Sequence, residues 1–454
     1  MKAKQMKDTI YAVRKTLQHY ANSGYLLIIA AILAFIAANT PLSDMYFSMW
    51  EKTMYFRIGN CDILTHHGEP LTVMQFINDA LMAVFFFAVG LEIKREVLVG
   101  ELSSFKKAVL PVIAAIGGVV LPITIYAVIA DEASQMRGAA IPMATDIAFS
   151  LGILSLFGRR VPIGLKIFLA TLAVADDLMG ILAIATFYTD AVYYEYLIYA
   201  AILLGIMILG MRFYNNSKMF YIILGIAVWF LFLNSGIHPT IAGVLTAFCV
   251  PARPLIKTSR FIDEIKEVMA DFPPSSGQKK GRSYILTPEQ MNMLKSVESA
   301  SDKVISPLQD LEDSVHPLVN YLIIPLFAFA NAGVSLSGLT AHALHEGVTP
   351  AVITGLFAGK FVGILLFSAI AIWLKISALP EGVTWRSLAG VAALGGIGFT
   401  VSFFISSLAF GENYPEMFAE AKIGVIVGSL LSGILGWAIL KKSLPEIAQN
   451  KVAQ

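Results

Sequence analysis

The feature that most constrains the fold is a series of twelve apolar runs, each about as long as a membrane-spanning helix. A bilayer core takes ~20 apolar residues per helix. Runs of this kind centre near residues 32, 83, 118, 147, 176, 202, 226, 244, 325, 361, 398 and 430. Only 14% of the residues are charged, well below the roughly 25% of soluble domains. The sequence therefore predicts an all-α polytopic membrane protein with twelve transmembrane helices.

The distribution of Lys and Arg predicts the orientation of these helices. The first 23 residues are cationic and lack the short apolar segment of a cleavable signal peptide. With this end inside, the inner loops and both ends hold 28 of the 33 Lys and Arg, and the outer loops hold only Lys52, Arg57, Arg137 and Lys422. Because inner loops of membrane proteins are enriched in these residues, we expect both termini in the cytoplasm. The net charge of +1 gives no indication of a nucleic-acid partner.

Two loops divide the chain into segments. The outer stretch 43–70 contains β-branched and aromatic residues around Gly59 and Asn60, which fits a hairpin, a shape that often mediates contacts between subunits, and equally fits an irregular loop. The predicted division is a cytoplasmic segment 1–23, helices one to eight in 24–256, a cytoplasmic insertion 257–315, helices nine to twelve in 316–440, and a cytoplasmic tail 441–454.

The insertion 257–315 is the only long hydrophilic segment. Its first part, FIDEIKEVMADF, places apolar residues at helical intervals and predicts an amphipathic helix. The following PPSSGQKKGR is typical of a flexible linker. Thr287 and Gln290 then form a capping-box pattern that predicts the start of a second helix. This composition favours a tether or a regulatory insertion over a catalytic domain.

Four charged residues lie deep within predicted spans: Asp146, Asp176, Asp177 and Lys360. A charge at the centre of a membrane helix costs about 2.5 to 3.5 kcal/mol on insertion scales, which makes such residues functional candidates. Three carboxylates against one ammonium leave an excess of negative charge that a membrane interior does not hold uncompensated. Protons or a metal cation must supply the missing charge, and the two compete for the same oxygens. Oxygen ligands suit hard cations, and the neighbouring Thr145 adds a further oxygen.

The two adjacent carboxylates cannot share one role in a helix. Neighbouring residues project about 100° apart, so Asp176 and Asp177 face different directions. One of them can face a cation site while the other meets Lys360. The alternative is that these charges only pair to hold helices together. That alternative would suffice for a lone Asp–Lys pair, but the two additional acids disfavour it.

Two predicted spans contain residues that interrupt a helix. Pro142 precedes Asp146 by four residues in the fourth span, and a glycine cluster stands just before Thr400 in the eleventh: Gly395, Gly396 and Gly398. Proline and clustered glycine release backbone groups from the helix ladder, which a membrane protein tolerates where the backbone is buried or lines a cavity. Interrupted helices in matching positions of two halves indicate a transporter binding site. The alternative is a packing kink or a close helix contact.

Several stretches around these residues resemble one known family. They include ATDIAFSLGILSLFGRRVP, LKIFLATLAVADDLMGILAIATFYT, INDALMAVFFFAVGLEIKREVLVGEL, IIPLFAFANAGVSLSG and GGIGFTVSFFISSLAF. They are similar to the NhaA-type sodium/proton antiporters of bacterial inner membranes. The resemblance extends from about residue 71 to residue 440, apart from 257–310.

The resemblance implies a fold and an activity. The implied fold has twelve transmembrane helices, inverted-topology repeats and two interrupted helices that cross, which are known features of this family. The implied activity is electrogenic, pH-regulated exchange of Na⁺ or Li⁺ for H⁺ by a secondary transporter, not an enzyme, and it requires no cofactor. The implied location is the bacterial inner membrane, with cytoplasmic termini and assembly as a homodimer.

The resemblance also implies residue roles. Asp177 matches the principal carboxylate for the cation and the proton, and Asp176 matches its essential neighbour, which pairs with Lys360. Thr145 and Asp146 match the first interrupted helix, where the Asp compensates the exposed helix ends. The position of Asp79 lies on the outer side of the cation path. The residues that match the pH-response region are Glu92, Arg95, Glu96, Glu312 and His316.

The chain also departs from the family pattern at three positions. Phe361 follows Lys360 where Pro is expected, and Gln309 and Asp313 replace basic and His residues before His316. These departures bear on the pH profile more than on the transport chemistry.

Three other functions remain as alternatives. A sodium-coupled symporter of related fold would need a substrate cavity. An intramembrane enzyme would need paired acids in a DxxxD or GxGD pattern, which the sequence lacks. A sensor that does not transport is supported only by the insertion 257–315.

Overall fold

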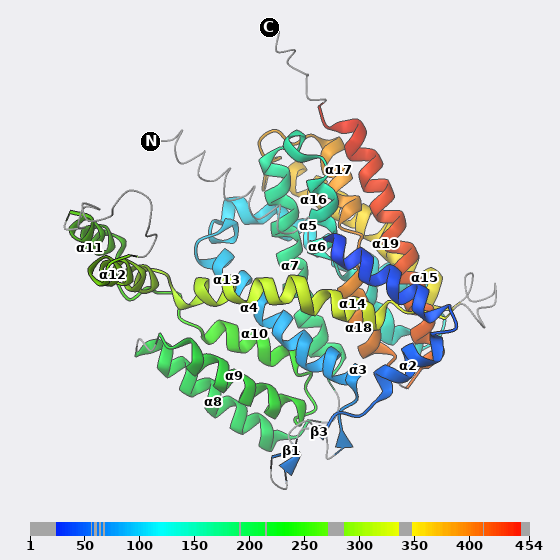
Figure 1. Ribbon diagram of the computed structural model, residues 1–454. Coiled ribbons are helices and arrows are strands. Elements are labelled where there is room, and N and C mark those ends of the chain that lie inside the picture. Colours follow the sequence, from blue (N-terminus) through cyan, green and yellow to red (C-terminus); the bar gives the residue numbers. More distant parts are fainter. Residues whose placement is uncertain are drawn as a thin grey trace, which may run out of the picture.

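The computed structural model describes residues 24–445 except 56, 59–60, 63–64, 67–68, 190–191, 214–215, 271–285, 336–346 and 412. Within this part the chain is almost entirely helical (Figure 1). After the helix Gly24–Ala38, the first half contains α2 (Ser43–Glu51), α3 (Val73–Phe76), the π-helical turn η1 (Ile77–Leu81), α4 (Met82–Leu98), η2 (Glu101–Ser103), α5 (Phe105–Ile129), η3 (Gln135–Met143), α6 (Ile147–Ser155), η4 (Gly158–Arg160), α7 (Ile163–Phe187), α8 (Tyr194–Arg212), α9 (Lys218–Leu233) and α10 (Thr240–Cys249).

The second half begins with the two helices of the insertion and continues into further apolar helices. Its elements are α11 (Thr258–Ala270), α12 (Pro288–Val304), α13 (Pro307–Leu318), the π-helical turn η5 (Val319–Ile323), α14 (Ile324–Asn331), α15 (Val348–Thr354), the π-helical turn η7 (Gly355–Gly359), α16 (Lys360–Trp373), α17 (Trp385–Leu394), α18 (Phe399–Ala409) and α19 (Pro415–Ser443).

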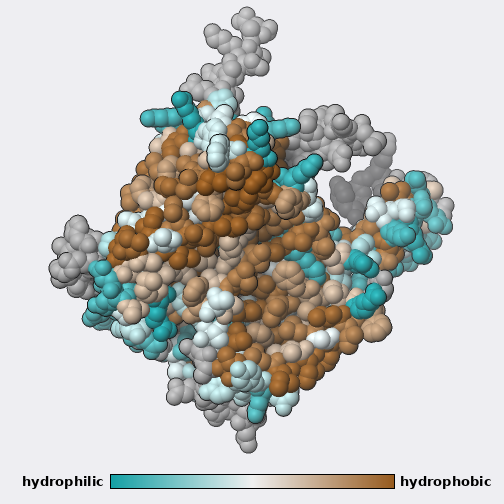
Figure 2. Space-filling view, turned by 180° about the vertical axis from the view of Figure 1, so that it is seen from behind, coloured by the Kyte–Doolittle hydropathy of each residue, from teal (hydrophilic) through white to brown (hydrophobic). Residues whose placement is uncertain are grey.

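The apolar helices identify a multi-pass membrane protein. In the described residues, eight helical stretches are long and apolar enough to cross a bilayer, and the number rises to ten if each of two bent pairs is one span. Two shorter apolar helices, α9 and α10, account for the remaining predicted runs. Figure 2 shows a broad apolar surface bordered by hydrophilic side chains, as expected for a surface that faces lipid.

The helices pack in two groups that meet at α4. On one side, α8, α9 and α10 form a layer with its own small core (Figure 1). On the other side, α5, α7 and α15 to α19 enclose the main core. Helix α7 is the most buried of the long spans, whereas α8 is mostly exposed. The carboxylates of α7 therefore lie at the centre of the larger group.

The stretch 43–70, which the sequence predicts as an outer hairpin, is helical in its first part. Residues 43–51 form α2 because its aromatic side chains pack inward: the Tyr46 hydroxyl donates to the Phe329 carbonyl at 2.6 Å, and Trp50 is buried against the Tyr46 ring. Two short antiparallel hairpins follow, β1 (Arg57–Ile58) with β2 (Cys61–Asp62) and β3 (Thr65–His66) with β4 (Glu69–Pro70). The predicted turn at 59–60 lies outside the described residues.

The insertion forms a helical hairpin that projects from the body (Figure 1). The predicted capping box is confirmed, because Thr287 accepts from the backbone N–H of Gln290 and the Gln290 side chain accepts from that of Thr287. The predicted linker lies outside the described residues. The helix that follows the insertion, α13, begins at Pro307, within the predicted range 257–315. Ser306 caps this helix by accepting from the Gln309 N–H.

The sequence predicts that Lys422 lies in an outer loop, and this prediction is wrong. It lies inside α19 with 8% of its surface exposed. Its Nζ sits 4.3 Å from the centroid of the Phe418 ring. The aromatic face stabilises the ammonium, so the span tolerates it.

Candidate functional site

Two interrupted spans meet at their breaks near the centre of the bundle. In the first, η3 ends at Met143 and α6 begins at Ile147. In the second, α17 and α18 are separated by residues 395–398 and bent by 43°. The backbone N–H of Asp146 donates to the carbonyl of Ile397 at 2.6 Å, so the two breaks touch. The predicted interruptions are thereby confirmed.

Asp146 interacts with the N-terminal ends of α6 and α18, which are the second halves of the two interrupted spans. It is the N-cap of α6, where its Oδ1 accepts from the Phe149 N–H at 3.0 Å. Its Oδ2 accepts from the Thr400 hydroxyl at 2.6 Å and from the Thr400 N–H at 3.2 Å, in the first turn of α18. Helix N-termini carry partial positive charge. One buried carboxylate therefore compensates two helix ends.

Asp176 and Lys360 form an ion pair that is closed to solvent. The Lys360 Nζ donates to Asp176 Oδ2 at 2.5 Å, and both side chains are fully buried. The Thr145 hydroxyl lies 2.6 Å from the same oxygen. Lys360 begins α16 directly after the π-helical turn η7, and the chain continues as an α-helix through Phe361. The backbone is thus helical at Phe361, where the sequence comparison leads one to expect Pro.

Asp177 lines a cavity instead. The residues that line the cavity include Asp177, Asp146 and the two hydroxyl residues Thr145 and Thr400. In the described part of the chain, Asp177 makes no hydrogen bond or ion pair. The two adjacent carboxylates of α7 therefore diverge as helical geometry requires: one is held in an ion pair, and the other borders open space.

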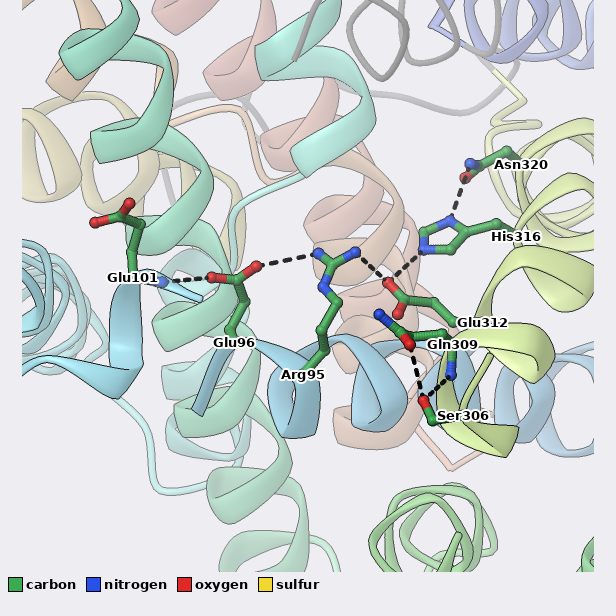
Figure 3. Close-up of polar contacts among 8 residues, drawn as sticks. All are labelled: Arg95, Glu96, Glu101, Ser306, Gln309, Glu312, His316 and Asn320. Carbon is green, nitrogen blue, oxygen red and sulfur yellow. Dashed lines mark hydrogen bonds and ion pairs between the residues drawn. The ribbon is translucent and has the colours of Figure 1, made fainter. Parts of the chain in front are cut away.

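Figure 3 shows a cluster of charged side chains from α4 and α13. The Arg95 guanidinium contacts Glu312 at 2.7 Å and Glu96 at 3.1 Å. His316 Nε2 lies 3.7 Å from the same Glu312 oxygen. Glu92 and His316 both line the cavity. The structure thus brings all five residues expected in the pH-response region to one place, and the cavity connects that place with Asp177.

Asp79 lies apart from this cavity. It sits in η1, thirteen residues before Glu92, a separation of roughly 20 Å along a helix. His238 Nε2 lies 3.5 Å from Asp79 Oδ1, and Trp229 donates to the Asp79 carbonyl at 3.2 Å. His238 was not singled out on sequence as a partner of Asp79. His238 stands in the turn NSGIHP, but the sequence of that turn does not indicate which span the imidazole contacts.

Lys94 and Asn320 also gain clear positions. The Lys94 Nζ donates to the carbonyls of Phe248 and Val250, at 2.7 and 2.5 Å, so this cation caps the C-terminal end of α10. Lys94 therefore contributes to helix packing and is separate from the charged cluster formed by Arg95, Glu96, Glu312 and His316. Asn320 lines the cavity and lies 3.5 Å from His316.

The oxygens around the cavity could bind a hard cation. The carboxylates of Asp146 and Asp177 and the hydroxyl residues Thr145 and Thr400 line it, and such ligands suit alkali and alkaline-earth ions. Across the described residues, no three His, Cys, Asp or Glu side chains converge as a metal-binding group. A bound cation would therefore draw on hydroxyl, carbonyl or water oxygens as well as on carboxylates.

Comparison with known proteins gives a consistent result. The family described as Na+/H+ antiporter 1 matches residues 14–440. A protein of Phocaeicola vulgatus named Na(+)/H(+) antiporter NhaA is 50% identical over 437 residues, covering 96% of this chain and 97% of that protein. A protein of the same name from Bacteroides thetaiotaomicron is 50% identical over 439 residues, covering 95% and 98%. One from Helicobacter pylori is 42% identical over 435 residues, covering 95% and 96%. The similarity thus includes both interrupted spans and α7.

Proposed function

The chain belongs to the Na⁺/H⁺ antiporter 1 family, and from this premise we propose that it is a secondary transporter, not an enzyme, that exchanges Na⁺ for H⁺ across a bacterial membrane. The observation that carries this proposal is the position of Asp177. It borders the cavity without a partner in the described part of the chain, while the neighbouring carboxylate is already paired.

The charges around the site support competition between cation and proton. Lys360 neutralises Asp176, and two helix N-termini compensate Asp146. Asp177 is left with no comparable compensation. A buried carboxylate in this position needs either a proton or a cation. If only one of them occupies the site at a time, the two flows are coupled without simultaneous binding.

The remaining site residues have roles that follow from their contacts. Asp177 is the carboxylate that binds the cation or the proton, and Asp176 holds Lys360 beside it. Thr145 and Asp146 present oxygens to the same cavity. The glycines Gly395 and Gly396 keep the second break compact, since a Cβ on Gly396 would lie 2.5 Å from both the Leu356 carbonyl and the Ser432 hydroxyl.

The transport cycle we propose is alternating access. The cavity leads from the Arg95 cluster to Asp177, which we assign to a state open towards the cytoplasm. Rocking of the bundle around the crossing would expose Asp177 to the other side, past Asp79. This scheme includes twelve spans in inverted repeats, cytoplasmic termini, an inner-membrane location and homodimers formed through the hairpins in 43–70. Li⁺ serves as an alternative substrate, and an excess of protons over cations makes the cycle electrogenic.

Regulation by pH is assigned to the cluster that joins α4 and α13. Arg95 ties α4 to α13 through Glu312, which His316 also approaches. Protonation of His316 adds a positive charge beside the Arg95–Glu312 ion pair that holds these two helices together next to the cavity. The insertion helices α11 and α12 are assigned as a tether or regulatory element.

Dequenching of a pH-sensitive dye in everted vesicles tests the proposed exchange. The wild type should collapse a preformed pH gradient on addition of Na⁺ or Li⁺, whereas Asp177→Asn should not. K⁺ provides the comparison cation. No wild-type response to any of these cations between pH 6.5 and 9 would contradict the function, and full activity in Asp177→Asn would contradict only the site. A sodium-coupled symporter would instead take up Na⁺ without moving protons in the opposite direction.

A further inference from the structure

The first half of each interrupted span ends inside the bundle, where its last backbone carbonyls need hydrogen-bond donors. The last carbonyls of a helix lack partners within it, and the membrane interior supplies no water to satisfy them. Helix α17 ends at Leu394 in the middle of the bundle, and η3 ends close to Ile141. Each end can therefore take hydrogen-bond donors from elsewhere in the protein, and the Leu394 carbonyl does so in addition to the Ile397 N–H, which donates to it at 3.1 Å.

Serine hydroxyls from the opposite broken span supply these donors. The Ser150 hydroxyl, on α6, donates to the Leu394 carbonyl at 2.8 Å. The Ser402 hydroxyl, on α18, donates to the Ile141 carbonyl, also at 2.8 Å. Both serines are completely buried. The second half of each broken span thus holds the first half of the other.

The two serines occupy equivalent positions in their helices. Ser150 follows the N-cap Asp146 by four residues, and Ser402 follows the N-cap Gly398 by four residues. The N-caps themselves differ. Asp146 provides the single carboxylate that serves both helix ends, while a Cβ on Gly398 would collide with the Ser402 hydroxyl. Glycine at this N-cap therefore leaves the space in which Ser402 reaches across.

Thr145 does not replace Ser150 at the end of α17. Its hydroxyl lies 2.7 Å from the Gly395 carbonyl and 2.6 Å from Asp176 Oδ2. A threonine hydroxyl has one hydrogen and can donate to only one of these acceptors at a time. Among the hydrogen bonds of the described residues, the Ser150 hydroxyl has no second acceptor. It therefore donates to the Leu394 carbonyl alone and caps the end of α17 more consistently than Thr145 does.

We propose that Ser150 and Ser402 are positioning residues for cation binding: their reciprocal bonds lock the two crossing spans and so hold Asp146 and Thr145 in place around the cavity. Loss of either bond lets one break shift against the other. Asp146, which is bonded to Thr400 on α18, shifts with it. A cation needs several oxygens at fixed distances, whereas a proton needs only one carboxylate oxygen. The effect therefore falls on cation affinity.

Kinetics of exchange test this inference, which rests on the proposed antiport. Ser150→Ala and Ser402→Ala should each raise the apparent KM for Na⁺ about fivefold to tenfold, as expected when a buried hydrogen bond between the two spans is lost, while the maximal rate per folded transporter changes little. The double variant should raise KM at least as far as either single variant. Half-saturation of the Na⁺-dependent rise in Tm of the purified protein gives a second measurement, and it should move in the same direction.

Two serines provide matched controls. The Ser406 hydroxyl, also fully buried in α18, donates to the Ser402 carbonyl within its own helix, and the Ser155 hydroxyl in α6 donates to the Gly152 carbonyl. Ser406→Ala and Ser155→Ala should leave KM at the wild-type value. Equal KM and equal half-saturation for wild type, Ser150→Ala and Ser402→Ala would overturn the inference, and so would a rise in KM of the same size in the controls. Wild-type protein that exchanges no cation would instead overturn the proposed function itself.

Discussion

Asp176 and Asp177 are neighbours in sequence and opposites in environment. Asp176 is held in a fully buried ion pair with Lys360, while Asp177 borders the cavity without a hydrogen-bond or ion-pair partner in the described part of the chain. The same residue type at adjacent positions of one helix therefore supports two tasks. A paired carboxylate contributes to structure, and an unpaired one is available to a ligand.

This difference also explains how the proposed site at Asp177 can work beside Lys360. The lysine neutralises the carboxylate that it reaches, and the 100° step of the helix directs the other one away from it. One ammonium can thus stabilise the charged interior while a cation or a proton still has a carboxylate to bind.

The largest expected effect separates the two carboxylates directly. Asp177→Asn should abolish Na⁺-dependent exchange in everted vesicles and leave Tm of the purified protein unchanged or higher, because an uncompensated buried carboxylate is replaced by a neutral amide. Asp176→Asn should lower Tm, because Lys360 then loses its partner. Equal changes in Tm for the two isosteric variants would show that their environments do not differ as described.

The next effect comes from removing the lysine. Lys360→Ala leaves Asp176 buried without its counter-ion, a change that destabilises proteins by about 3 to 5 kcal/mol. We expect a lower Tm and impaired exchange with an altered pH profile. The double variant Lys360→Ala/Asp176→Asn should recover much of the stability, since it removes both charges. If Lys360→Ala retained the wild-type Tm and pH profile, the ion pair would have no part in holding the site.

A smaller effect is expected at Thr145, whose hydroxyl reaches the paired carboxylate. Thr145→Val removes a hydrogen bond to a charged group, a loss of about 1.5 to 3 kcal/mol. Tm should fall by less than in Lys360→Ala, and the apparent KM for Na⁺ should rise because Thr145 also lines the cavity. The control is Thr186→Val, since the Thr186 hydroxyl bonds only within α7. A Thr145→Val protein with wild-type Tm and KM would remove this residue from the site.

Much of this arrangement could be predicted from sequence, because lipid imposes strict rules. Apolar runs identified the helices, Pro142 and the Gly395 cluster identified the breaks, and burial of charge identified the acids. The helical step predicted that Asp176 and Asp177 diverge. It could not tell which of them meets Lys360, because rotation of a helix about its axis depends on packing against its neighbours. That assignment came from the family resemblance.

The features that sequence did not predict depend on distant contacts. Residues 43–51 are helical because Tyr46 bonds to a carbonyl almost three hundred positions away. The π-helical turn before Lys360 contains one more residue than an α-helical turn, and no local sequence pattern predicts it. The reciprocal bonds of Ser150 and Ser402 depend on which helices cross, so single serines in apolar spans gave no indication of them.

The smallest expected effect tests whether the insertion influences the site that contains the two carboxylates. Thr287 caps α12 in the projecting insertion, and α12 connects through residues 305–306 to α13, which carries Glu312. Thr287→Ala should destabilise α12 locally by about 1 kcal/mol, the usual value for a lost N-cap. Faster amide hydrogen exchange in α12 would report this change.

The control is Ser296→Ala, an exposed position in the same helix whose hydroxyl bonds to the Asn292 carbonyl. Both variants should keep the wild-type KM and pH profile, because neither position touches the cavity. A shifted pH profile in Thr287→Ala alone would mean that the insertion acts on Glu312 through α13, and the site would then extend beyond the bundle.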